Sequence, residues 1–187
     1  MFRDDIAKEL LPKFMECDLS VLATPLFHFT VNALMKTFIE RTLPMAQPFF
    51  VEKNGVTSHP IRNEPPPVVA ISVAGFPEES VFDQLKSYLR FLYGKRLVAE
   101  IYRSSSEMFR ADPKEKSVKD VLDAAVQAGR ELVESMQISP ETLERIKRPI
   151  SDFKKMSGLG NLAWQTCIDE GVTMGGFQKR GMVHRPN

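Results

Sequence analysis

Cysteines and long apolar runs are scarce in this sequence. Cys17 and Cys167 are the only cysteines, and they stand far apart in unrelated patterns. They offer no metal-ligand spacing, and so few thiols suit a reducing compartment. No apolar run approaches the ~20 residues of a membrane-spanning helix, and residues 1–5 lack the apolar segment of a signal peptide. We therefore expect no membrane partner and a cytoplasmic location.

An excess of charge of one sign is also missing. Lys and Arg number 25 against 24 Asp and Glu, and the two signs are interspersed along the chain. Because there is no basic block, a nucleic acid partner is not expected. The sequence has neither a Gly-x-Gly-x-x-Gly motif nor a P-loop, and His59 and His184 have no Cys, Asp or Glu at ligand spacing. Neither a Rossmann dinucleotide site nor a metal site is therefore predicted.

A rhythm of strands and helices runs through most of the chain. Apolar residues make up 43% of the 187 residues, enough to bury a core. Apolar runs predict strands at residues 19–23, 68–74 and 97–102, with helical patterns between them. This alternation is typical of a parallel sheet with right-handed crossovers. We expect an α/β domain over residues 1–135 and a helical extension and tail over residues 136–187.

One helix is expected directly after the first strand. Its apolar residues recur at helical spacing, so that one face packs on the sheet. The members of this stripe are Val31, Leu34, Met35, Phe38 and Ile39. Before the strand, Pro12 must kink or break a short helix, and beyond the stripe Asn54-Gly55 predicts the turn of a hairpin.

The later helices are predicted from their caps and breakers. Gly94 is expected to end an apolar stripe as a C-cap glycine. Ser117, with an acid three residues later, is expected to cap the next helix, and Ser139 precedes a proline that opens another. A last helix is expected over residues 161–169, before a polar tail over residues 175–187.

The loops that leave two of these strands form the candidate site. In an open parallel sheet, ligands bind where the chain leaves the carboxyl ends of the strands. Aromatic side chains in these loops offer flat faces to a planar ligand. The candidate residues are Thr24, Pro25, Leu26, Phe27, His28, Phe29 and Thr30 in the first loop, and Gly75, Phe76 and Pro77 in the second. The plainer interpretation is that both loops are ordinary turns whose phenylalanines are buried as packing.

The first loop and the helix after it resemble a known family. The matching positions are Thr24-Pro25-Leu26-Phe27, Thr30, Asn32, Leu34-Met35-Lys36, Phe38-Ile39 and Glu40-Arg41-Thr42. They are similar to a motif of the NAD(P)H-dependent FMN reductase and iron–sulfur flavoprotein branch of the flavodoxin-like superfamily. The sequence departs from that motif at Phe27, where the family prefers Tyr, and at Phe29, where it has Gly. It also has His28 in place of a frequent Phe and Glu40 in place of Asp.

The resemblance implies a flavodoxin-like three-layer fold with an open parallel sheet and, in this chain, extra C-terminal helices. It implies FMN as the cofactor, held at the two loops through backbone amides and phenyl faces. NAD(P)H would be the electron donor, and the acceptor a small molecule or a protein. In this superfamily the flavin carries the redox chemistry, so no catalytic side chain is assigned.

One part of the family pattern has no counterpart in this sequence. Family members begin with a strand whose loop holds the FMN phosphate, followed by a helix and a second strand, and nothing before Phe2 matches these elements. We therefore expect an N-terminally truncated fold whose first strand has an unpaired edge. A second copy, the chain's own hairpin or its tail is expected to cover that edge. In a homo-oligomer, Arg or Lys of the second copy would hold the phosphate.

Two alternatives remain open at this point. The chain is either a reductase or a flavin-free remnant of the fold that acts as an oligomerising or binding module. Phe29 favours the remnant, because its ring could fill the space of the isoalloxazine. A further alternative is that Met1 is an internal methionine of a longer reductase.

Overall fold

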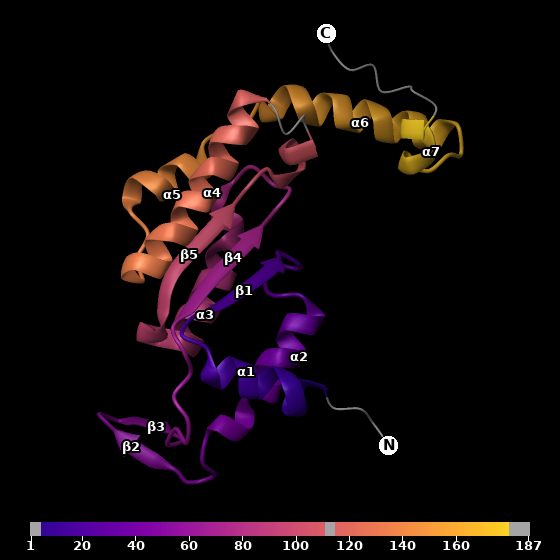
Figure 1. The fold of residues 1–187 in the computed structure, drawn as a ribbon. Coiled ribbons are helices and arrows are strands. Elements are labelled where there is room, and N and C mark those ends of the chain that lie inside the picture. The colour runs from indigo at the N-terminus through magenta and orange to yellow at the C-terminus, as the bar shows by residue number, and fades with distance from the viewer. Residues whose placement is uncertain (1–4, 111–114, 180–187) are drawn as a thin grey trace. The chain divides into compact units, whose positions relative to one another are not determined.

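A computed structural model describes residues 5–110 and 115–179 (Figure 1). It is an α/β fold with an open parallel sheet, a small separate hairpin and several C-terminal helices. The chain divides into two compact units, Met1–Arg148 and Pro149–Asn187. In chain order the elements are η1 (Ile6–Leu10), α1 (Leu11–Glu16), β1 (Ser20–Pro25), α2 (Ala33–Arg41), η2 (Leu43–Met45), β2 (Val51–Lys53), β3 (Val56–Ser58), β4 (Val68–Val73), η3 (Glu79–Phe82), α3 (Asp83–Tyr93), η4 (Gly94–Arg96), β5 (Leu97–Arg103), η5 (Ser106–Arg110), α4 (Lys116–Ser135), α5 (Pro140–Lys147), α6 (Phe153–Asp169) and α7 (Met174–Lys179).

The three predicted strands are confirmed, and they form one parallel sheet in the order β1-β4-β5. The middle strand, β4, is the most buried of them. Val68 and Val69 point to opposite faces of the sheet, and both are fully buried. This burial on both faces is why the sequence of β4 reads as a continuous apolar run.

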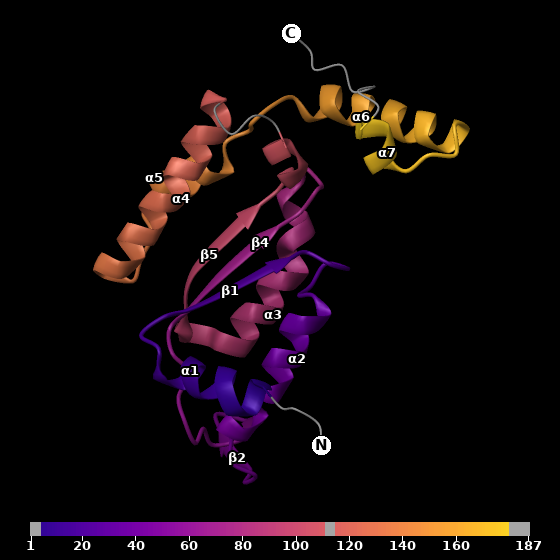
Figure 2. The ribbon, with the colours of Figure 1, turned by 45° about the vertical axis from the view of Figure 1, so that its right-hand side comes forward.

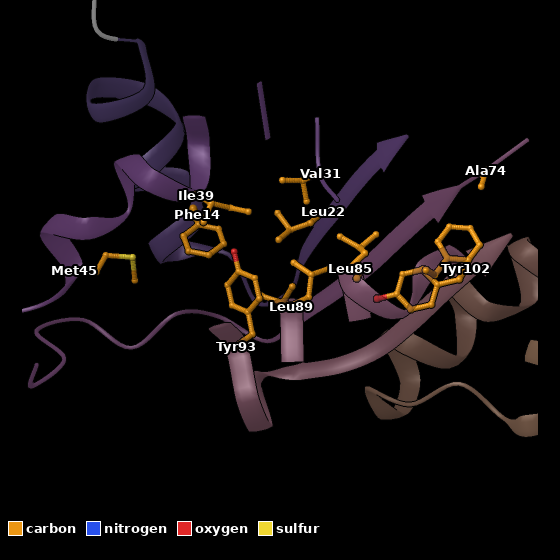
Figure 3. Close-up of a cluster of buried hydrophobic side chains, with 13 residues drawn as sticks. Phe14, Leu22, Val31, Ile39, Met45, Ala74, Leu85, Leu89, Tyr93 and Tyr102 are labelled. Atoms are coloured by element: carbon orange, nitrogen blue, oxygen red, sulfur yellow. The ribbon is translucent and has the colours of Figure 1, made fainter. Parts of the chain in front are cut away.

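Helices cover the sheet on both faces (Figures 1 and 2). On one face, α2 and α3 pack over Leu22, Val68 and Ala70 in the main apolar cluster (Figure 3). On the other face, α4 and α5 bury Ala124 and Ile146, with Ile101 of β5 packed against them. The arrangement is therefore layered, as the sequence predicted.

The helix after β1 packs on the sheet with a narrower face than predicted. Asn32 caps it, since its Oδ1 accepts a hydrogen bond of 2.8 Å from the N–H of Met35. Ile39 is buried and Met35 packs against the core, but Leu34 is 82% exposed. The prediction for Leu34 was wrong because this residue lies in the first turn, at the margin of the apolar stripe.

The predicted caps have a mixed outcome. Gly94 ends α3 with φ of 50°, a left-handed conformation that favours glycine, so this prediction is confirmed. Ser117 does not cap α4: the helix begins at Lys116 after Glu115, and the Ser117 hydroxyl instead donates a hydrogen bond to the Glu115 carboxylate. Ser139 does cap α5 and accepts the N–H of Thr142.

The predicted hairpin is confirmed at Asn54-Gly55. The two residues have φ of 55° and 75°, which is the geometry of a tight type I′ turn. Its strands, β2 and β3, pair only with each other in the described part of the chain. The chain's own hairpin was one of the segments expected to cover the edge of β1. It does not pair with that edge, so this alternative is wrong.

The second unit consists of α6 and α7, which differ from the predicted boundaries. The helix expected over residues 161–169 begins earlier, at Phe153, and residues 175–179 of the expected tail belong to α7. Cys167 and Phe177 are buried. Residues 180–187 lie outside the described residues. In the part of the chain that the structure describes, no helix is long and apolar enough to cross a membrane.

Tyr93 brings a polar group into the main core (Figure 3). Its hydroxyl is buried and has no hydrogen-bond partner among the described residues. Burial raises the pKa of Tyr93 to about 12. A buried hydroxyl without a partner costs about 1–3 kcal/mol, so the ring stabilises this core while the oxygen weakens it.

We predict that Tyr93→Phe keeps or raises the free energy of unfolding, by up to about 1 kcal/mol, because it removes only the unpaired oxygen. Leu85→Ala, at a fully buried position of the same helix, should lower it by about 2–5 kcal/mol. Urea unfolding measures both changes. A loss of stability in Tyr93→Phe would mean that the hydroxyl has a partner.

Glu131 joins the end of α4 to the start of α5. Its carboxylate accepts hydrogen bonds of 2.7 Å from the N–H of Ser139 and 2.7 Å from the hydroxyl of Thr142. The Ser139 N–H contributes most to holding the pKa of Glu131 below its ordinary value. The ionised form of Glu131 is therefore favoured in the folded chain over the unfolded one.

Since the folded pKa of Glu131 is depressed, its contribution to stability is present above the unfolded pKa, about 4.3. That contribution is lost as the pH falls through the lower, folded pKa. Glu131→Gln should therefore be less stable than the wild type at pH 7, with the difference shrinking on acidification below about pH 4. Thermal unfolding across pH tests this, with Glu134→Gln on the exposed side of α4 as the control. An equal deficit at all pH values would contradict the electrostatic origin.

Candidate functional site

The two candidate loops leave the sheet side by side. In the pairing of β1 with β4, Pro25 stands opposite Val73 at the carboxyl end of both strands. The N–H of Leu26 donates a hydrogen bond of 3.0 Å to the carbonyl of Val73, which extends the contact by one residue. The parallel register therefore brings residues 26–30 and 74–77 to the same end of the sheet.

Residues 27–30 form a tight turn at the tip of the first loop. Phe27 and Thr30 exchange backbone hydrogen bonds of 3.1 and 3.0 Å. Between them, His28 and Phe29 have φ of 47° and 63°. Both are therefore left-handed, as in a type I′ turn, a conformation that costs side chains other than glycine about 1–2 kcal/mol. Phe29 has this conformation at the position where the family that the motif resembles has glycine.

The base of the first loop is fixed from within. Thr24 is buried, and its hydroxyl oxygen accepts a hydrogen bond of 3.1 Å from the N–H of Asn32. Asn32 in turn caps α2, and Leu26 packs against the main core. The side chains of Thr24 and Leu26 thus hold the loop in place, while those of residues 27–30 are exposed.

The second loop is held by the chain that leaves β5. The N–H of Ser105 donates to the carbonyl of Phe76 at 2.8 Å, and the N–H of Ser106 donates to that of Ala74 at the same distance. A Cβ at Gly75 would stand 3.8 Å from Cγ of Glu107. Gly75 is exposed, and Pro77 closes the loop half-buried.

Residues 104–107 are therefore a third segment at this end of the sheet, which was not among the candidate residues predicted from the sequence. The signal was available: they follow the carboxyl end of the third parallel strand, to which the same rule applies. The run Ser104-Ser105-Ser106 carries no aromatic ring, and for that reason it did not stand out.

Three phenyl rings are exposed at the site. Phe27 is 58% exposed, Phe29 51% and Phe76 59%. The interpretation that these rings are buried as packing is therefore wrong. Within the described residues, no hydrogen bond uses the N–H of His28, Phe29 or Gly75. The loops thus combine apolar faces with unused backbone donors, which suits a planar ligand whose rim carries hydrogen-bond acceptors.

A cavity of about 390 Å³ lies elsewhere, between α3, β5 and α5. Its walls carry paired charges: Arg90 lies 2.8 Å from Glu100, and Lys147 lies 3.3 Å from Glu79. None of the candidate loop residues lines it. Its volume is at the lower end of the range for small-molecule sites, but its charges already neutralise one another. Among the described residues no group of three or more His, Cys, Asp or Glu could hold a metal.

The chain matches no protein-family model and no curated protein. What is established is the class, an α/β fold with a small parallel sheet flanked by helices.

We predict that Phe29→Gly raises the free energy of unfolding, by up to about 1 kcal/mol, because glycine adopts the left-handed conformation without strain. Phe27→Gly is the matched control: Phe27 lies in the same turn without a positive φ, so it should lose about 0.5–1 kcal/mol. Chemical unfolding measures both. If Phe29→Gly is the less stable of the two, its ring makes contacts that outweigh the backbone strain.

Proposed function

We propose that the chain binds FMN at the carboxyl ends of β1 and β4 and acts as an oxidoreductase. In this proposal, NAD(P)H supplies the electrons and a small molecule or a protein accepts them. The observation that carries the proposal is the combination of exposed rings at Phe27, Phe29 and Phe76 with unused N–H groups on adjoining loops. An isoalloxazine needs both, since its faces are apolar and its rim accepts hydrogen bonds.

Different groups of the chain would contact the faces and the rim of the flavin ring. Phe27 and Phe76 come from different loops and offer the faces against which a flat ring stacks. The N–H groups of His28 and Phe29 lie at the tip of a turn that is already fixed, so little conformational entropy is lost when they donate. When bound, FMN supplies the redox chemistry itself. The protein needs only to bind, orient and partly exclude water from the ring.

The phosphate of FMN is the group for which the described residues fit least well. A phosphate is usually held by a glycine-rich loop or by cations, and this sequence has no such loop. Lys36, the motif lysine, is engaged by the Tyr88 hydroxyl at 3.3 Å and by Glu40 at 3.5 Å. We therefore assign the phosphate to cationic side chains of a second copy in a homo-oligomer.

Titration of the purified chain with FMN, followed by flavin fluorescence and the visible spectrum, tests the proposal. We expect saturable binding, and NAD(P)H oxidation by the loaded protein with an artificial acceptor. Phe27→Ala should raise the dissociation constant at least about tenfold, because stacking on an aromatic ring contributes about 1–3 kcal/mol. Phe49→Ala, an equally exposed ring in the chain before the hairpin, should leave it unchanged.

A second candidate function is a flavin-free binding or oligomerising module. It is favoured by one observation, the bulky Phe29 at a left-handed position where the resembling family has glycine. A colourless protein that takes up no FMN at any concentration tested would rule out the oxidoreductase and leave this module. Binding that is equally strong in Phe27→Ala would place the flavin elsewhere.

A further inference from the structure

The two edge strands of the sheet, β5 and β1, differ in charge. At the β5 edge, Arg90 of α3 pairs with Glu100 of β5 at 2.8 Å, and Lys86 and Lys147 line the cavity beside the strand. Charged side chains along an edge strand hinder the addition of another strand. The pairing of β5 with β4 also contains an irregularity, between Val68 and Val69, which further disfavours a flat, open edge.

The edge strand β1 has neither charged side chains nor an irregular pairing. Its six residues, Ser20–Pro25, include no charge, and their register with β4 runs without a shift. The only proline is the last residue. In the described part of the chain, no strand pairs with the outer edge of β1. Its sequence is that of an interior strand, although its place in the sheet is at the end.

An uncovered apolar strip lies beside this edge. Val21 is 52% exposed and Val73 is 40% exposed. Val21 and Pro25 are four positions apart in the strand, so their side chains lie on the same face of the sheet. Pro25 stands opposite Val73, so the side chain of Val73 shares that face. Ala23, between Val21 and Pro25, is exposed as well. Further along the same face, α4 and α5 cover Ile101 of β5.

We propose that a second copy of the chain occupies this edge, with the two β1 strands antiparallel about a two-fold axis. The three-stranded sheets of the two copies would then join into one continuous sheet. The pairing uses the backbone donors and acceptors of both edges and brings the two apolar strips together. It stands whether or not the chain binds FMN.

Self-pairing is favoured over other occupants for two reasons. In an antiparallel pair about a two-fold axis, each strand meets its own sequence reversed, so any charge on β1 would enter the contact twice, once from each copy. Because β1 carries no charge, self-pairing buries none. In addition, a two-fold contact consumes both open edges and closes, whereas a head-to-tail contact would leave an edge open and form fibres.

Light scattering coupled to size-exclusion chromatography of the full chain tests the proposal. We expect about twice the chain mass of 21.2 kDa at micromolar concentration. Val21→Lys should weaken the dimer roughly 100-fold or more, because it places one charge from each copy in the apolar contact. Val133→Lys is the matched control and should remain a dimer, since Val133 lies in α4 and is 82% exposed. Circular dichroism checks that each variant is folded.

A charge of the opposite sign at the same position makes the test specific for this strand. Val21→Glu should be monomeric, as Val21→Lys is, because either charge would be buried in the apolar contact. The proposal is overturned if the wild type is monomeric, if Val21→Lys dimerises as tightly as the wild type, or if Val133→Lys dissociates equally. It is also overturned if Val21→Glu dimerises as tightly as the wild type. Light scattering of Phe27→Ala, which should remain a dimer whether or not it binds FMN, separates this result from the fate of the cofactor proposal.

Discussion

The pairing of β1 with β4 is the constraint on which the rest of the structure depends. β4 is buried on both faces, so its register cannot slip by one residue without exchanging side chains of different size, such as Val69 and Ala70, between two close-packed faces. That register sets Pro25 opposite Val73, and the bond from Leu26 to Val73 carries the alignment into the loops. The candidate site is thus a consequence of apolar burial well away from it.

Backbone strain at the tip of the first loop is maintained by this rigid base. Two adjacent residues other than glycine, His28 and Phe29, are left-handed, and such a conformation persists only where its surroundings fix it. Here the surroundings are the Phe27–Thr30 bonds and the link from Thr24 to Asn32. The same turn geometry leaves the two N–H groups unused within the described chain, so strain and binding capacity have one cause.

The sequence was sufficient where one physical effect dominates. The apolar run of β4, the Asn54-Gly55 turn and the cap at Gly94 each follow from burial or from a left-handed backbone, and each was predicted correctly. It was insufficient where two effects compete. Ser117 is a good capping residue, but its hydroxyl bonds to the side chain of Glu115 instead. Of the candidate site, the two loops were predictable from strand order. The same rule applies to residues 104–107, but without an aromatic ring they did not stand out, and their bonds to Ala74 and Phe76 became visible only in the structure.

The unpaired edge and the candidate site share the strand β1, and this determines which residues of the strand can be substituted. An edge that pairs through its main chain tolerates different uncharged side chains, because the main-chain hydrogen bonds do not depend on them. The carboxyl end of β1 has no such freedom, since Thr24 must hold Asn32 and Leu26 must reach the core. Within one strand, the choice of residue at positions 21 and 23 is therefore limited by whatever covers the edge, whereas the choice at position 24 is limited by the loop. A change at Phe27, which lies beyond β1, can therefore alter flavin binding without touching the edge, and this is why the two proposals can be separated by experiment.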